Sequence, residues 1–308
     1  MSKVKQRKNN RQVKLLVGSA ICLLLIMTVG YAAFSTKLTI GAKGNIKTLT
    51  AANFLSQNVV TEGDGLYVAE SNKNLRSAHS KSRYIYKGQN PNNNLTFNNE
   101  NWKIISVEED GSVKIIKESP LDIELPWDSN KLNTWENSTI QDYLNNTYLN
   151  QMADNSKKQV VEHAFNIGAI KPATENMKIT NDELQIAEAS KTWNGYIGLI
   201  NISDYITASN DTLCTSVKSL NDKDLPCHKS NYLYKENTKF WFINSVSEVQ
   251  DKVWHFSNSL EQLPTFEKSS VYPVLYLDGN ISLQGDGTSI NPYTIKSSNW
   301  AFLNYFID

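Results

Sequence analysis

Histidine and cysteine are scarce in this chain, and their scarcity argues against most nucleophilic and metal-dependent chemistry. The 308 residues include only four histidines and three cysteines. No GxSxG elbow, HExxH pair or cysteine-protease signature surrounds any of the histidines, and no CxxC pair occurs. Hydrolases and zinc sites of the common kinds need such residues at these spacings. We therefore expect a protein that is not an enzyme and that carries no cofactor and no metal.

Loops that hold phosphate or calcium are also missing. The segment GDGTSINPYTI, from Gly285 to Ile295, places one acid between two glycines, but no Lys and no Ser or Thr follow in the order of a phosphate loop. A calcium loop needs six to eight converging oxygens, and the segment does not provide them. The apolar run VYPVLYLD precedes it. The pattern predicts a turn between two strands, and the alternative is a calcium ion shared by Asp278 and Asp286.

Acidic residues are absent from the first 32 positions, which contain six of the 31 Lys and Arg residues. The remainder therefore has 25 basic against 31 acidic residues, a net charge of about −6 by this count. A surface of that sign offers no electrostatic footprint for nucleic acid, so we exclude nucleic acid as a partner.

The basic head precedes an uncharged run, LLVGSAICLLLIMTVGYAAF, over residues 15–34. At about 1.5 Å rise per residue, a helix of this length just spans a bilayer core, and the preceding positive charges place its N-terminal end in the cytoplasm. Gly30 and Ala32 also suit a cleavage site after Ala32. Both interpretations predict an exported protein. It is either held in the membrane by residues 15–34, with its C-terminal domain outside the cytoplasm, or secreted after cleavage.

Export changes the interpretation of the cysteines. Cys22 lies inside the apolar run, which leaves Cys214 and Cys227 with 12 residues between them. An oxidising environment favours a disulfide between this pair. Two alternatives stay open at this point, namely a zinc site that adds His228 and a pair of free thiols.

The pattern of apolar residues predicts both helices and strands. Asp110-Gly111 divides two alternating runs and indicates a hairpin over 102–119. Ser138 is a plausible N-cap for an amphipathic helix that ends near Met152. Short aromatic runs follow late in the chain, among them KFWFIN, KVWHFSN and VYPVLYLD. We therefore predict an α+β fold, with an N-terminal transmembrane or signal helix followed by one domain rich in antiparallel strands.

The corresponding division of the chain has four parts. These are a signal or transmembrane segment, a linker, an extracytoplasmic α+β domain and an apolar C-terminal tail, at residues 1–34, 35–59, 60–298 and 299–308.

Five segments in order carry a resemblance to known proteins. They are GDGLY, RYIYKGQNPNNNLTFNNENWKIISVEEDGSVKIIKES, WNGYIGLINISDY, VYPVLYLDGNISL and GDGTSINPYTI. Together they resemble a large group of uncharacterised exported and cell-surface proteins of Gram-positive bacteria. The order WNGYIGL, a cysteine pair, FWFIN, VWHF and VYPVLYLD is also similar to the late part of C-type-lectin-like folds. The chain has Tyr272 where we expect Arg before the proline, and the calcium signatures of lectins are missing.

These observations predict a non-catalytic surface protein that binds or adheres to a glycan or protein ligand, such as a cell-wall glycan. Aromatic side chains often anchor such ligands, and the candidates that could face a ligand are Trp241, Trp254 and Tyr272. The alternative function is a structural subunit of an envelope filament that pairs through an edge strand or the tail. A further alternative is an enzyme related to the lectin-like fold.

Overall fold

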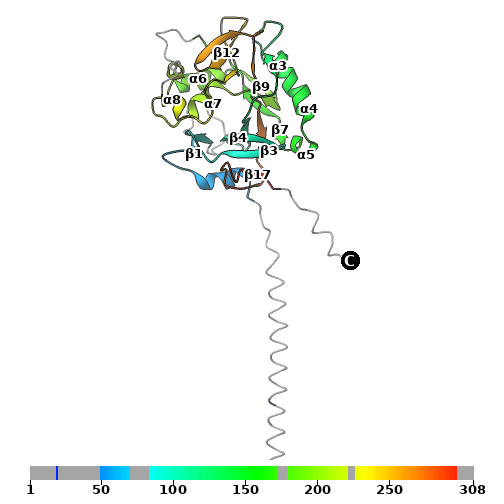
Figure 1. Ribbon diagram of the computed structural model, residues 1–308, viewed down its shortest axis with the longest axis vertical. Helices are drawn as coiled ribbons and strands as arrows, with labels where there is room; N and C mark the ends of the chain where they lie inside the picture. Colours follow the sequence, from blue (N-terminus) through cyan, green and yellow to red (C-terminus); the bar gives the residue numbers. More distant parts are fainter. Residues whose placement is uncertain (1–18, 20–48, 70–82, 173–178, 221–225, 297–308) are drawn as a thin grey trace, which may run out of the picture. The chain divides into compact units, whose positions relative to one another are not determined.

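Short strands and shorter helices, joined by long loops, make up the part of the chain that the computed structural model describes (Figure 1). The described residues are 19, 49–69, 83–172, 179–220 and 226–296. The chain divides into two units, residues 1–48 and 49–308, and apart from Ser19 every described residue belongs to the second unit. The predicted α+β class is confirmed.

The helices of this unit are brief. The α-helices are α2 (Ala51–Leu55), α3 (Thr139–Asp142), α4 (Leu149–Gln151), α5 (Asp154–Lys157), α6 (Asn181–Glu188), α7 (Ile202–Thr207) and α8 (Pro226–Lys229). Two 3-10 turns, η1 (Ser56–Asn58) and η3 (Val217–Leu220), and one π-helical segment, η2 (Tyr143–Tyr148), complete the set among the described residues. In Figure 1, α6, α7 and α8 lie on one flank of the unit and α3, α4 and α5 on the other.

The larger sheet runs in the order β10-β15-β5-β4-β3-β17-β16, with β1 and β2 joined to β4 and with β7 paired to β15. Most neighbours are antiparallel, but β17 runs parallel to β3. The strands of this sheet are β1 (Gly65–Val68), β2 (Tyr84–Lys87), β3 (Asn94–Phe97), β4 (Glu100–Val107), β5 (Val113–Lys117), β7 (Val160–Val161), β10 (Ile197–Gly198), β15 (Val274–Leu277), β16 (Leu283–Gln284) and β17 (Tyr293–Ile295).

A second sheet of five strands has the order β13-β12-β11-β14-β6, and a two-stranded ribbon pairs β8 with β9. Their bounds are β6 (Glu124–Pro126), β8 (His163–Asn166), β9 (Thr192–Gly195), β11 (Lys239–Ser245), β12 (Lys252–Ser257), β13 (Leu260–Pro264) and β14 (Lys268–Ser270).

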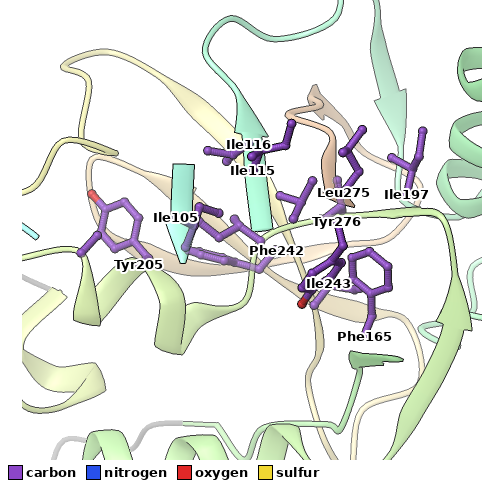
Figure 2. Close-up of a cluster of buried hydrophobic side chains, with 14 of the residues drawn as sticks. Ile105, Ile115, Ile116, Phe165, Ile197, Tyr205, Phe242, Ile243, Leu275 and Tyr276 are labelled. Carbon is purple, nitrogen blue, oxygen red and sulfur yellow. The ribbon is translucent and has the colours of Figure 1, made fainter. Parts of the chain in front are cut away.

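The main core forms where the two sheets meet (Figure 2). Ile115 of β5, Ile197 of β10 and Leu275 of β15 gather with Phe242 and Ile243 of β11, and all five side chains are fully buried. Burying a side chain of this size stabilises the fold by about 1.5–3 kcal/mol. This shared core holds β5 and β11 in fixed positions relative to each other, and both strands contribute to a pocket at the surface.

The backbone has the conformation that two local sequence signals predict, a hairpin and a helix N-cap. β4 and β5 pair antiparallel, and the turn between them places Gly111 at a φ of 92°, a conformation that favours glycine. The oxygen of the Ser138 side chain accepts a hydrogen bond of 3.3 Å from the backbone N–H of Gln141 at the start of α3. The helix then passes through the π-helical η2 before it ends as α4.

The folded unit begins inside the predicted linker of residues 35–59, because α2 starts at Ala51. α2 packs into the core with Ala51 and Leu55 fully buried, and the backbone N–H of Ala51 donates to the carbonyl of Ile281 over 2.7 Å. Small and apolar residues at these two positions are thus explained by packing. The sequence offered no long periodic stretch there because the helix has only five residues.

Within the described ranges, no helix has the length and hydropathy needed to cross a membrane. The predicted membrane or signal segment, residues 15–34, lies outside the described residues except for Ser19. The predicted tail at 299–308 lies outside them as well.

Candidate functional site

A small pocket opens where the end of β5 meets the loop before β11, and its cavity volume is about 30 Å³. The larger sheet contributes one wall, through β4 and β5. The loop over residues 230–238 contributes a second wall. The residues that line the pocket are Lys103, Ile116, Lys117, Glu118, Ile200, Tyr232, Leu233, Lys235, Thr238, Phe240 and Tyr272.

The loop that forms the second wall is fixed by one buried amide. Asn231 is 3% exposed, and its side-chain nitrogen donates to the carbonyl of Tyr205 in α7 over 2.8 Å. Its side-chain oxygen accepts from the backbone N–H of Leu233 over 2.9 Å. The hydroxyl of Thr238 donates to the carbonyl of Lys235 over 2.6 Å and closes the turn into β11. The wall is therefore built by specific polar contacts.

The floor of the pocket is apolar and aromatic. Ile116 of β5 and Phe240 of β11 are each 6% exposed, and Ile200 is 1% exposed. The ring of Tyr272 meets the Phe240 ring edge-on with centroids 5.7 Å apart. Tyr272 is only part-buried, so one side of this aromatic pair faces the opening. A flat or branched apolar group fits such a surface.

Three lysines surround this floor. Lys103 hydrogen bonds to the side-chain oxygen of Asn94 over 2.6 Å and lies 3.5 Å from the carboxylate of Glu118. Lys117 lies 3.3 Å from the carboxylate of Glu100. Lys235 donates to the backbone carbonyl of Glu118. Three ammonium groups thus face two carboxylates, and the rim has an excess of one positive charge.

Lys235 is an exposed residue, but its ammonium is partly desolvated. Burial lowers its pKa from the ordinary value, and Lys103 lowers it further, although the Glu118 carboxylate acts in the opposite direction. An additional negative charge at the mouth would favour the charged form of Lys235. The rim is therefore better suited to an anion than to a cation.

A second polar cluster lies inside the fold, next to the pocket. Lys114 of β5 pairs with Asp204 of α7 over 2.6 Å, and both side chains are nearly buried. Arg83 pairs with Glu108 over 2.8 Å and also approaches Asp204 at 3.7 Å. Burial opposes ionisation of Glu108, but Arg83 and Lys114 outweigh this effect and lower its pKa to about 2. Two cations thus balance two carboxylates and tie the larger sheet to α7.

Glu188, at the end of α6, is a third carboxyl group beside this balanced cluster. It is 1% exposed and accepts a 3.0 Å hydrogen bond from the backbone N–H of Ser203, while the Ser203 hydroxyl bonds to its other oxygen. Burial raises the pKa of Glu188 to about 8; the two Ser203 bonds oppose this rise, and the Asp204 charge adds to it. Glu188 is therefore largely protonated at neutral pH and acts as a buried hydrogen-bonding group.

Tyr232 connects the pocket with this cluster. The residue lines the pocket, is 8% exposed, and its pKa is raised by burial and by the nearby Asp204. Its hydroxyl has no hydrogen-bond partner among the described residues.

One arrangement of residues in the five-stranded sheet has the composition of a hydrolase triad. The Nε2 atom of His255 lies 2.8 Å from the Ser269 hydroxyl, and the Nδ1 atom lies 4.0 Å from a carboxylate oxygen of Glu261. His255 and Ser269 are 2% and 0% exposed, and the Trp241 ring packs edge-on against the imidazole at 5.0 Å. A substrate carbonyl must reach the serine oxygen for acyl transfer. Because both residues are enclosed, this contact belongs to the core.

The aromatic residues selected from the sequence lie in different environments. Trp241 and Trp254 are 1% and 2% exposed, so they pack in the core. The indole nitrogen of Trp241 donates to the carbonyl of Leu125 over 2.9 Å. Of the three candidates, Tyr272 alone lines the pocket. Lys103, Lys117 and Lys235 were missed because isolated lysines in the sequence indicate no site.

Cys214 and Cys227 form a disulfide, as the sequence predicted. The bond joins the segment before η3 to α8, immediately before His228. The Nδ1 atom of His228 lies 3.2 Å from the hydroxyl of Tyr205. With both sulfurs bonded to each other, the zinc alternative and the free-thiol alternative no longer apply.

In each of the two Asp-Gly turns, the aspartate side chain accepts hydrogen bonds from a residue of the same turn. Asp286 accepts bonds from the backbone N–H and the hydroxyl of Thr288, at 3.0 and 2.7 Å. Asp278 accepts from the backbone and side-chain nitrogens of Asn280, at 2.9 and 3.0 Å. Across the described ranges, no three His, Cys, Asp or Glu residues are grouped closely enough to hold a metal ion. β16 and β17 pair antiparallel around the GDG loop, which is a turn between two strands.

Comparisons with protein-family models, with curated proteins and with solved structures gave no match to this chain.

Proposed function

We propose that this chain is an exported, non-catalytic binding protein, and that the pocket beside Tyr272 is its ligand site. The pocket carries the proposal because it combines an apolar floor with a cationic rim on a rigid frame of β5, β11 and an anchored loop. Binding sites commonly pair an apolar surface with a few placed polar groups. Its ligand is a component of the cell surface, either a glycan or a protein.

The location outside the cytoplasm rests on the amino-terminal sequence. Residues 15–34 carry no charge and come after six basic residues, which favours membrane insertion with export of the domain on the C-terminal side. The disulfide is in keeping with an exported domain, since such bonds persist in non-reducing compartments. Either the segment anchors the chain in the membrane, or its removal releases the domain.

The likeness to C-type-lectin-like folds is part of the same proposal. Long irregular connections, a disulfide in the later half of the chain and antiparallel strands around it support this likeness. The ligand would then be bound without calcium, through side chains of the pocket.

Two measurements test the proposal. Intact mass spectrometry on membrane and medium of the source cells should find either the full chain in the membrane or a shorter chain, starting near Ala33, in the medium. Co-sedimentation should show that the full chain, purified in detergent, binds washed cell envelopes. A Leu233→Trp variant, which fills the pocket, should lose that binding. Cytoplasmic full-length protein, or envelope binding that is unchanged in Leu233→Trp, would contradict the proposal.

A further inference from the structure

The pocket is too small to enclose a whole ligand. Its cavity volume is about 30 Å³, whereas sites that enclose small molecules usually measure roughly 300–1,000 Å³. It has room for one chemical group, and the remainder of the ligand must lie on the surface around it. This geometry is typical of interfaces in which one side chain enters a pocket and anchors an extended segment.

The floor selects the chemistry of that group. Ile116, Ile200 and Phe240 offer no hydrogen-bonding side-chain atoms. A sugar ring needs hydrogen-bond partners for the hydroxyls around its edge, and the floor itself supplies none. A phenylalanine or leucine side chain has no such groups and covers the same apolar area, so the floor favours a peptide anchor over a sugar.

The rim determines which charge is favoured on the ligand residues that flank this group. Lys103 and Lys117 line the pocket, their side chains are 20% and 14% exposed, and each ammonium lies within 3.5 Å of a carboxylate. With Lys235 they exceed the carboxylates of Glu100 and Glu118 by one charge. Acidic residues on both sides of an anchored side chain would complement this excess.

We propose that the pocket binds an acidic peptide segment of a partner protein, with one large apolar side chain inserted between Tyr272 and Leu233 and with its carboxylates at Lys103, Lys117 and Lys235. This inference rests on the proposed function, because it names the ligand class of the same site. The Tyr272 and Phe240 rings contact the inserted side chain. The lysine rim fixes the direction of the peptide through its flanking acids.

Fluorescence anisotropy with labelled pentapeptides tests this ligand class on the full chain, purified in detergent. The probe has phenylalanine with two glutamates on each side, and the comparison peptides replace the phenylalanine by alanine or the glutamates by lysines. We expect the alanine peptide to bind about 30-fold more weakly, as for the loss of a hot-spot anchor. The lysine peptide should not bind, and added salt should weaken the binding of the acidic probe.

Variants of the chain identify the site. Leu233→Trp should remove the preference for phenylalanine over alanine. Lys235→Glu should lower the affinity for the acidic probe about tenfold, because it reverses one charge at a partly desolvated rim. Lys191→Glu is the matched control, because Lys191 pairs with Glu136 away from the pocket lining and the variant makes the same change in net charge. A thermal unfolding curve for each variant shows that the fold is retained.

Several outcomes would overturn the inference. Equal binding of the phenylalanine and alanine peptides would exclude an apolar anchor. If polygalacturonate binds, Leu233→Trp abolishes that binding and the acidic probe does not bind, then the ligand is an acidic sugar and not a peptide. If envelope binding still depends on Leu233 while no peptide binds, the ligand class is wrong and the proposed function stands. If envelope binding does not depend on Leu233, the proposed function itself fails.

Discussion

Replacing Glu188 by glutamine should stabilise this protein at neutral and alkaline pH. The folded chain holds the Glu188 carboxyl in a buried site, where burial raises its pKa to about 8. In the unfolded chain the group has an ordinary pKa, 4.5. Between these two values the folded state binds a proton that the unfolded state has released. The stability that the protonated Glu188 contributes is thus fully present below the unfolded pKa and is lost as the pH rises toward 8.

The magnitude is set by the two pKa values. Each pH unit above 4.5 costs about 1.4 kcal/mol of unfolding free energy until the folded group ionises. The loss is about 1 kcal/mol at pH 5, about 3 kcal/mol at pH 7 and about 4 kcal/mol at pH 8. A glutamine presents the same one acceptor and one donor to Ser203 as the protonated acid does, and it does not titrate. Glu188→Gln should therefore gain these amounts over the wild type.

Urea unfolding of both proteins, followed by tryptophan fluorescence at pH 5, 6, 7 and 8, measures this difference. Glu62→Gln removes the same charge at an exposed position and should stay within about 0.5 kcal/mol of the wild type at every pH. A stability difference between Glu188→Gln and wild type that does not change from pH 5 to pH 8 would refute the reasoning. Such a result would mean that Glu188 does not hold its proton in the folded chain.

Three further predictions concern the same fold. Glu108 has a folded pKa of about 2, so the wild type should lose about 3 kcal/mol as the pH falls from 4.5 to 2, and Glu108→Gln should lose correspondingly less in acid unfolding curves. Replacing Cys214 and Cys227 together by serine should cost about 3 kcal/mol in urea unfolding, whereas alkylation of both thiols in unreduced wild type would disprove the disulfide. Leu275→Ala should cost about 2–5 kcal/mol because its side chain is fully buried; an effect as small as that of the exposed Leu213→Ala would contradict the described core.

Local features were the most predictable from the sequence. The hairpin at Asp110-Gly111 and the cap at Ser138 depend on the conformational preferences of a few neighbouring residues, and both are present. The disulfide was also predictable, because only one cysteine pair remains outside the apolar run. These predictions needed no knowledge of which distant segments meet.

The faces of the aromatic strands could not be assigned in the same way. Every residue of β11 after Lys239 is buried, since both faces of the strand are covered. Alternation of apolar and polar residues therefore carries no signal there, and Trp241 could not be separated from a surface aromatic. Tyr272 lies just before β15, and its position at the pocket depends on the packing of β15 against β5.

The pocket and the buried charges depend on long-range contacts. Lys103 and Lys235 are 132 positions apart in the numbering and come together only because β4 and the loop before β11 line the same pocket. Glu188 ends a helix whose exposed face carries other acids, so its sequence context is that of a solvated residue. Burial of such a group is decided by the tertiary packing of α6 against α7.

A crystal structure of the full chain bound to the acidic phenylalanine pentapeptide tests the central claim most directly. The account predicts that the phenylalanine ring lies between Tyr272 and Leu233, against Ile116 and Phe240, with a glutamate carboxylate near Lys103 or Lys235. A peptide bound elsewhere on the chain, with the pocket empty, would contradict it.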